Sequence, residues 1–225
     1  MNKLNQLKLL ENGIIVFGSR PGMGLTRTTL KIANQLAKSV NVVFISYQDY
    51  KEKLIKIIKE QGESLNPHLM IDTDLNFYEY GFTQDISELI SRTSAHTLII
   101  DDLDGMLGED FNLENQYRDK FLLELKSLAQ SNNTRIILNV TVSRKVEYRG
   151  GDRKPMLRDF TWSRNLINVA EQVFSVYRPE YYGLTEDENG ISTLGRIEID
   201  LIKDKNCNEN LYVLVNKEER ILPEY

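Results

Sequence analysis

The chain has 225 residues, of which 41% are hydrophobic and 27% are charged, so it has enough apolar material to bury a sizeable core. This composition excludes intrinsically disordered and collagen-like proteins. The formal net charge is -5, and any contact with nucleic acid must therefore come from a local basic patch. One cysteine and two histidines exclude an internal disulfide and a Cys/His zinc cluster.

The sequence shows no sign of secretion or of a membrane span. Residues 1–13 contain no apolar signal core, and no apolar run approaches the roughly 18 residues that a membrane-spanning helix needs. A single cysteine fits a reducing compartment. We therefore expect a cytoplasmic protein without a membrane partner.

Short apolar runs alternate with longer stretches of helical period, which is typical of a mostly parallel sheet covered by helices. Near the C-terminus, residues 196–202 and 210–215 alternate apolar with polar side chains, so we expect two antiparallel strands at an edge of the sheet. The stretch 69–82 shows no clear period and is assigned no element. The other expected strands are 13–18, 42–46, 97–102, 135–140 and 172–178.

Four amphipathic helices are expected, one of them a short helix at 83–92. The sequence contains no internal repeat, low-complexity tract or long linker, so we expect one domain over residues 1–225. The predicted inner faces of the other three helices are Leu30, Ala33 and Leu36; Tyr50, Leu54, Ile57 and Ile58; and, in a long helix over 113–131, Leu113, Tyr117, Phe121, Leu125 and Leu128.

A loop containing glycine joins the first expected strand to the first helix. Such a loop binds phosphate, because its backbone N–H groups and the helix dipole converge on an anion. The sequence SRPGMGLT keeps the spacing, the second glycine and the hydroxyl of the pattern G-x-x-x-x-G-K-S/T, but has leucine in place of lysine. An ordinary strand-to-helix turn is the alternative. The residues predicted to hold nucleotide are Ser19, Arg20, Pro21, Gly22, Met23, Gly24, Leu25 and Thr26.

Two carboxylates, Asp101 and Asp102, end the apolar strand 97–102. In phosphate-loop enzymes, an aspartate at the end of a later strand holds magnesium, so Asp101 and Thr26 are predicted as ligands of Mg²⁺. An aspartate that only starts a turn is the alternative. Arg20 lies inside the loop and could reach a phosphate, whereas Arg27 should point away, since two helical positions past the leucine correspond to about 200° of rotation.

Six segments together resemble the C-terminal motor domain of DnaB-type replicative helicases in their order and spacing: SRPGMGLT, LIIDDLDGM, ELKSLAQSNNTRIILNV, SRKVEYR, DRKPMLRDF and VFSVYRPEYYG. The resemblance runs from about residue 13 to the last expected strand. It implies a RecA-like α/β phosphate-loop fold that binds ATP and Mg²⁺. It also implies hexameric rings that hydrolyse nucleotide between subunits and unwind DNA from 5′ to 3′. The N-terminal helical domain and linker helix of the family have no place in these 225 residues.

The resemblance also implies roles for single residues. The family's catalytic glutamate falls on Gln48, whose amide can orient water but cannot take its proton, although Asp49 beside it could. The sensor glutamine falls on Thr141, and the lysine and arginine-finger positions fall on Lys203 and Lys205. A lysine finger keeps the charge but loses the bidentate fork of arginine. With the loop lysine also replaced, efficient ATP hydrolysis is not expected.

DNA contacts are expected from a basic segment and from the stretch after it. In the family, a loop after the DRKP-like segment holds single-stranded DNA; here this stretch supplies a tryptophan and an arginine, the ingredients of sequence-independent binding. A solvated loop with a buried tryptophan is the alternative. The predicted DNA-binding residues are Arg144, Arg149, Arg153, Lys154, Trp162 and Arg164, and Lys145 and Arg158 belong to the same basic cluster.

Three functions are compatible with these residues. We favour a degenerate ATPase that serves as a nucleotide- or DNA-binding module, or as the non-catalytic partner of an active helicase subunit, in DNA replication or recombination. The first alternative is a working ATP-dependent helicase in which Arg20, Asp49 and Lys205 replace the missing groups. The second is a protein-interaction domain that self-associates and binds neither ligand. Turnover with magnesium would indicate the first alternative, and self-association without ligand binding the second.

Overall fold

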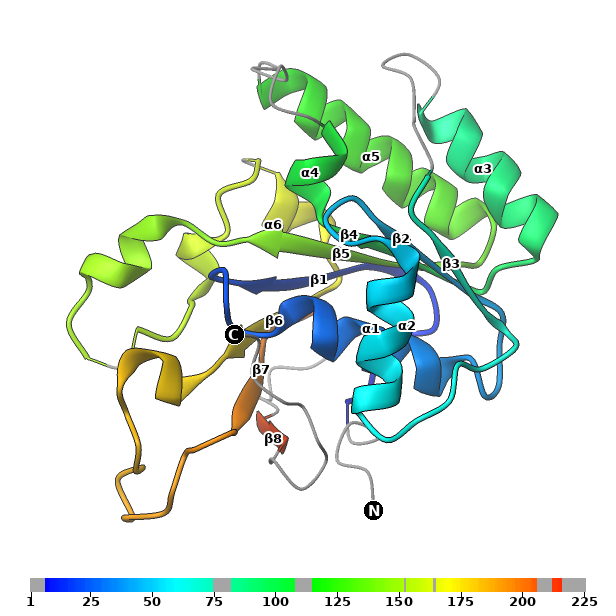
Figure 1. Ribbon diagram of the computed structural model, residues 1–225. Helices are drawn as coiled ribbons and strands as arrows, with labels where there is room; N and C mark the ends of the chain where they lie inside the picture. The colour runs from blue at the N-terminus through cyan, green and yellow to red at the C-terminus, as the bar shows by residue number, and fades with distance from the viewer. Residues whose placement is uncertain are drawn as a thin grey trace.

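The computed structural model describes residues 7–74, 82–107, 115–151, 153–163, 165–205 and 212–215. Its centre is an eight-stranded sheet with the strand order β3-β2-β4-β5-β1-β6-β7-β8 (Figure 1). The strands are β1 (Gly13–Ser19), β2 (Val42–Ser46), β3 (Leu69–Asp72), β4 (Thr97–Asp101), β5 (Arg135–Thr141), β6 (Gln172–Tyr177), β7 (Ile197–Asp204) and β8 (Tyr212–Val215).

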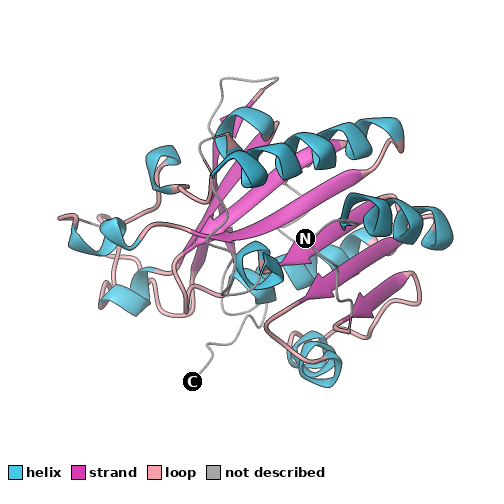
Figure 2. Ribbon diagram, turned by 90° about the horizontal axis from the view of Figure 1, so that it is seen from above, coloured by secondary structure: helices cyan, strands magenta, loops and turns pink. Residues whose placement is uncertain are grey.

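The direction of the strands confirms the fold expected from the sequence. All pairs from β3 to β6 are parallel. The pairs β6–β7 and β7–β8 are antiparallel and form one edge of the sheet. The strands fan out across the molecule, as a twisted sheet does (Figure 2).

Helices cover both faces of the sheet, with α3 and α5 on one side and α1 and α2 on the other (Figure 1). Within the described residues, no helix has both the length and the apolar character needed to cross a membrane. The helices are α1 (Leu25–Leu36), α2 (Lys51–Glu60), α3 (Phe82–Thr93), α4 (Leu103–Leu107), α5 (Asn115–Ser131) and α6 (Leu166–Val169), with 3₁₀ turns η2 (Arg144–Tyr148), η3 (Leu157–Asp159) and η4 (Pro179–Tyr182).

Side-chain alternation along the central strands divides the core into two clusters. In β1, Ile14 and Val16 belong to the cluster under α3 and α5, whereas Ile15 and Phe17 belong to the cluster under α1 and α2. Every residue of β1 is buried, since both faces of a parallel sheet are covered. This is why the sequence shows β1 as an unbroken apolar run.

The structure corrects three details of the predicted elements. Residues 69–72 form β3, a short edge strand with alternating burial, where the sequence predicted no element. Tyr50 is not on the inner face of α2 but precedes it and is 64% exposed. Tyr117 is 55% exposed, because α5 turns a neighbouring stripe inward, and Leu113 lies outside the described residues. The buried residues of α5 are Leu122, Leu125, Leu128 and Ala129.

Candidate functional site

The loop between β1 and α1 leaves the start of the helix open to an anion. Gly24 is the N-cap residue of α1, with a φ of 80°, and having no side chain it makes no capping hydrogen bond to the N–H groups of the first turn. Gly22 also has a positive φ, of 82°, a conformation that glycine adopts without strain. The first turn of α1 contains no acidic residue. Free N–H groups at the positive end of a helix dipole form an anion site.

A cavity of about 270 Å³ lies beside this loop, at the carboxyl ends of the parallel strands. Ligand sites of open α/β sheets lie at this edge. The cavity brings together residues from four separate segments, including the predicted positions Gln48, Asp101 and Thr141. Its lining residues are Ser19, Arg20, Pro21, Gly22, Gly24, Leu25, Thr26, Gln48, Asp101, Asp102 and Thr141.

Asp101 is buried at the end of β4 and accepts hydrogen bonds from three neutral donors. The Thr26 hydroxyl and the Asn139 amide both donate to Oδ1, over 3.1 and 2.6 Å. The Ser46 hydroxyl donates to Oδ2 over 3.4 Å. Burial raises the pKa of Asp101 to about 7; Asn139 and Thr26 act against this shift, and the nearby charge of Asp102 adds to it.

The pair formed by Thr26 and Asp101 suits a magnesium ion. Mg²⁺ prefers oxygen ligands and is commonly held by one or two carboxylates, with water and substrate phosphates completing its coordination. A hydroxyl and a carboxylate meet here, directly beside the open end of α1. In the part of the chain that the structure describes, no group of three or more His, Cys, Asp or Glu could hold a metal by itself. Water and the phosphates of a ligand would therefore supply the remaining oxygens.

No side chain among the described residues takes the place of the missing loop lysine. Leu25 packs against the core cluster under α1. Arg20 is the one cation among the described residues that line the cavity, and it is engaged elsewhere. Its Nε donates to Glu147 over 2.9 Å, and its Nη1 to the Val142 carbonyl over 2.8 Å. Arg27 points away from the cavity as expected, toward Glu60 of α2.

The position predicted for a catalytic glutamate carries an amide that is already bound. Gln48 Nε2 donates to Asp102 Oδ2 over 2.7 Å. The neighbouring carboxylate, Asp49, does not line the cavity and forms an ion pair with Lys53 at 2.5 Å. Neither residue is placed to take a proton from water in this cavity.

Lys203 and Lys205 lie far from the loop, at the amino ends of the parallel strands. Asp204 pairs with Gln172, at the start of β6, whereas the loop follows the end of the parallel strand β1. The Lys203 ammonium donates to the carbonyls of Ile167 and Ala170, and Lys205 is exposed. The structure therefore does not bring the two finger positions to the cavity of their own chain.

The structure corrects the prediction that Trp162 offers a stacking face to DNA. The Trp162 ring is buried in the core cluster under α5. It meets Phe121 edge-on, with 6.3 Å between ring centroids, and the Arg118 guanidinium lies 5.2 Å from its centroid. No base can reach this ring. Arg164 lies outside the described residues.

Two cations of the predicted basic cluster form close ion pairs within the fold, and a third lies over an aromatic ring. Arg149 pairs with Asp159 over 2.8 Å, and Lys154 with Glu198 over 2.6 Å. Arg153 lies over the Tyr182 ring, 5.0 Å from its centroid. By contrast, the Arg144 side chain is 73% exposed and 3.9 Å from Glu147. Lys145 and Arg158 are also exposed.

Two residues near the cavity were not predicted from the sequence. Asn139 is fully buried in β5 and bonds to Asp101, and Glu147 holds Arg20. A polar residue inside the apolar run RIILNV is a usable signal for Asn139, since buried amides need hydrogen-bond partners. Nothing local in the sequence marks Glu147.

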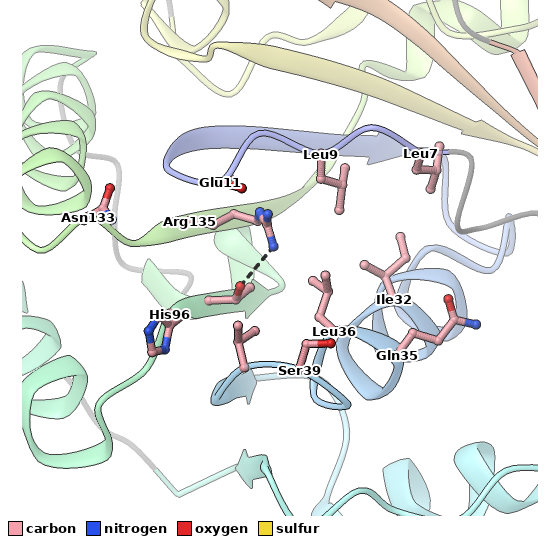
Figure 3. A pocket seen from close by; sticks show the side chains of 12 residues that line it. Leu7, Leu9, Glu11, Ile32, Gln35, Leu36, Ser39, His96, Asn133 and Arg135 are labelled. Carbon is pink, nitrogen blue, oxygen red and sulfur yellow. Dashed lines mark hydrogen bonds between the residues drawn. The ribbon is translucent and has the colours of Figure 1, made fainter.

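A second and larger cavity, of about 580 Å³, lies at the amino ends of the parallel strands, where Thr97 and Arg135 begin β4 and β5. Leu9, Ile32 and Leu36 form its apolar side, and Arg135 faces them and donates to the Thr97 hydroxyl over 3.2 Å (Figure 3). Burial lowers the pKa of Arg135. None of the residues predicted to bind nucleotide, metal or DNA lines this cavity. Cavity size alone would therefore point away from the phosphate loop.

Solved structures with the same architecture define the class of fold. One described as an ATPase domain aligns with a TM-score of 0.72 and 20% identity, over 91% of this chain and 81% of that chain. Another, described as a DnaB-like replicative helicase and its interactions with primase, aligns with a TM-score of 0.75 and 21% identity, over 92% of this chain and 55% of that chain. The chain thus has the RecA-like fold of helicase ATPase domains.

The family model described as DnaB-like helicase C terminal domain matches residues 51–219, and the chain belongs to this family. The replicative DNA helicase DnaB of Geobacillus stearothermophilus is 23% identical over 86% of this chain and 48% of that protein. The replicative DNA helicase DnaC of Bacillus subtilis is 24% identical over 87% and 48%. The DNA repair protein RadA of Streptococcus pyogenes is 30% identical over 59% and 29%. The chain spans about half the length of these helicases.

Proposed function

We propose that this chain is a nucleotide-binding module that holds the phosphates of Mg-ATP or Mg-ADP and hydrolyses ATP poorly or not at all. One observation carries the proposal. The cavity joins an open helix N-terminus to a hydroxyl–carboxylate pair, Thr26 and Asp101, while its one described cation is held by Glu147. Binding elements are thus present together, and the groups that drive hydrolysis are not among the described residues of the cavity.

The binding half of the proposal depends on backbone and oxygen chemistry. The N–H groups at the start of α1 would hold phosphate oxygens. Thr26 and Asp101 would supply two oxygen ligands to Mg²⁺, and the metal would link them to the phosphates. When bound, Mg²⁺ neutralises phosphate charge, which is the role that the missing lysine would otherwise share.

The loss of hydrolysis depends on two side chains. Leu25 brings no charge to the phosphates, and Gln48 gives its amide to Asp102. Removing one electrostatic donor from an active site typically raises the barrier by about 2.7–4 kcal/mol. We therefore propose that the domain works as a non-catalytic partner of an active helicase subunit in DNA replication or recombination, with residues 1–225 acting as one unit.

Calorimetry with Mg-ATP and Mg-ADP, followed by phosphate release with and without single-stranded DNA, tests this function. We expect saturable, magnesium-dependent binding and a release rate no higher than that of Asp101→Ala. Binding should weaken in both Asp101→Ala and Thr26→Val, because each removes one proposed metal ligand. Release well above the Asp101→Ala rate would show a working ATPase, and the absence of binding at millimolar nucleotide would end the nucleotide hypothesis.

Single-stranded DNA binding is a second candidate function, and the surface of η2 favours it. Tyr148 is 82% exposed and lies between Lys145 and Arg149 in the sequence. With exposed Arg144 and Lys145 it offers what the buried Trp162 does not, an aromatic face beside cations. We propose that this surface, rather than the stretch 161–163, contacts the strand.

Fluorescence anisotropy with a labelled oligonucleotide tests this second function. Stacking on an aromatic ring is worth about 1–3 kcal/mol per base, so Tyr148→Ala should weaken binding by roughly five- to 150-fold. Tyr50→Ala is the matched control, since Tyr50 is 64% exposed and lies at the start of α2. Equal affinities for the wild type and Tyr148→Ala would exclude this surface.

A further inference from the structure

Asn139 connects the proposed metal ligand to the first turn of α1 through a single amide group. It lies two residues after Ile137 in β5, so its side chain points to the face that α1 covers. Its Nδ2 donates to Asp101 Oδ1 over 2.6 Å and to the Thr29 hydroxyl over 2.8 Å. The residue is fully buried.

We propose that Asn139 is a positioning residue that fixes the Asp101 carboxylate relative to the phosphate loop, so that Thr26 and Asp101 present their oxygens to one Mg²⁺ ion. This inference rests on the proposed nucleotide function and adds to it a residue that touches neither metal nor phosphate.

The hydrogen-bond directions around Asn139 are mutually consistent. The two amide hydrogens serve two acceptors, the Asp101 carboxylate and the Thr29 oxygen. The Thr29 hydroxyl is then free to donate its own hydrogen to the Leu25 carbonyl, over 3.1 Å. The chain of donors therefore runs from Asn139 through Thr29 into the first residue of α1. One amide holds both the carboxylate of β4 and the helix that begins at the phosphate loop.

The same residue is poorly satisfied as a structural element. Its Oδ1 is buried and has no hydrogen-bond partner among the described residues, which disfavours folding. Leu138 and Val140, its neighbours along β5, point to the other face of the sheet, whereas Ile137, on the same face as Asn139, is a buried apolar residue. A leucine at position 139 would remove the unpaired oxygen together with the hydrogen bonds to Asp101 and Thr29. The amide is thus accounted for by what its nitrogen does for Asp101 and α1.

The variant Asn139→Leu separates positioning from folding. We expect its melting temperature to stay close to that of the wild type, because removal of the unpaired oxygen offsets the lost hydrogen bonds to Asp101 and Thr29. We expect its affinity for ADP in the presence of Mg²⁺, measured by calorimetry, to fall at least tenfold. Affinity for ADP in EDTA should change less than twofold, since the backbone cradle is intact. If Asn139 had a purely structural role, its replacement would not lower ADP affinity in Mg²⁺ while leaving ADP affinity in EDTA unchanged.

Two further variants sharpen the test. Thr29→Val keeps the shape of the side chain but removes the hydroxyl that links Asn139 to the Leu25 carbonyl of α1. We expect it to lose less Mg-ADP affinity than Asn139→Leu does. Asn34→Leu is the matched control, since Asn34 is a buried amide of α1 that bonds to Glu63 and the Ser64 carbonyl. It should lower the melting temperature and leave Mg-ADP affinity unchanged.

The outcomes distinguish this inference from the function on which it rests. A wild type that binds Mg-ADP and an Asn139→Leu variant that binds it equally well would overturn the inference and leave the proposed function standing. A wild type without Mg-ADP binding would overturn both. If Asn139→Leu does not fold, the claim about its stability is wrong, and wild-type affinity in Thr29→Val would then overturn the positioning role as well.

Discussion

Leu25 is the residue at which the site departs most clearly from the phosphate-loop pattern. Its side chain packs on the core cluster under α1 and brings no charge to the cavity. Gln48 adds a second departure, because its amide is bound to Asp102. These two residues separate the chemistry of binding from the chemistry of hydrolysis.

Replacing Leu25 by lysine should restore part of the lost phosphate binding. A charge-assisted hydrogen bond is worth about 1.5–3 kcal/mol, so Leu25→Lys should tighten Mg-ATP binding roughly tenfold or more in calorimetry. Leu25→Met, which adds no charge, is the control. Phosphate release should stay low in Leu25→Lys and rise only when Gln48→Glu is added. Unchanged affinity in Leu25→Lys would show that this position does not face the phosphates.

Asp101 makes the stability of the fold depend on pH. Its pKa is raised from the ordinary value of 3.8 to about 7, mainly by burial, so the folded state favours the neutral acid. The stability from this group is fully present below about pH 4 and is lost as pH rises through about 7. The gain in stability of Asp101→Asn, which stays neutral, should therefore be larger at about pH 8 than at about pH 5 in urea unfolding. An equal difference at both pH values would contradict this assignment.

At the scale of elements, Phe160, which directly follows η3, packs so closely on β1 that only glycine fits at position 18. A Cβ on Gly18 would lie 2.2 Å from Phe160 Cε1, and Phe160 is buried. This contact fixes the last turn of η3 against the strand that leads into the phosphate loop. Packing here and loop geometry are therefore coupled.

Adding one methyl group at Gly18 should destabilise the fold. Overpacking a core typically costs about 1–3 kcal/mol, and the Phe160 ring must move to admit the new Cβ. Gly18→Ala should therefore lower the urea midpoint clearly. Gly150→Ala is the control, since nothing lies within 4 Å of its Cβ position, and its midpoint should match the wild type. A Gly18→Ala midpoint equal to that of the control would show that this contact relaxes freely.

Across the whole molecule, the carboxyl and the amino ends of the parallel strands form two separate sides of the sheet. The phosphate loop, Asp101 and Thr141 lie at the carboxyl ends of the parallel strands. The end of β7, with Lys203 and Lys205, lies at their amino ends, because β7 is antiparallel to β6. A side chain at the amino ends of the strands cannot reach a ligand at the carboxyl ends in the same chain. Any role for Lys205 at a nucleotide would need the site of another chain.

Lys205→Ala should therefore leave nucleotide binding by the separate chain unchanged. We expect its Mg-ADP affinity to agree with the wild type within about twofold, measured at concentrations where light scattering shows a monomer. Thr26→Val, at the loop, serves as the positive control for loss of binding. A marked loss in Lys205→Ala under these conditions would contradict the separation of the two sides.

The positions of the central strands along the chain, the loop and the place of Asp101 at a strand end follow from local sequence. Apolar runs bounded by a glycine loop or by aspartates mark the central strands, because these strands are buried on both faces. The edge strand β3 and the inner stripe of α5 were harder to predict. A four-residue strand has too few residues for a period, and a stripe one position away fits the same helical spacing nearly as well.

Sequence patterns predicted the mostly parallel sheet, the phosphate loop with Leu25 in place of lysine, and the meeting of Thr26 with Asp101, since the carboxyl ends of parallel strands lie on the same side of the sheet. The RecA-like fold was implied by the resemblance to the helicase family. The folded structure was needed to show that Trp162 is buried, that Arg149 and Lys154 of the basic cluster are paired within the fold, and that Asn139 lies against Asp101. These facts depend on partners far along the chain, and local periodicity carries no information about which distant side chains a residue will meet.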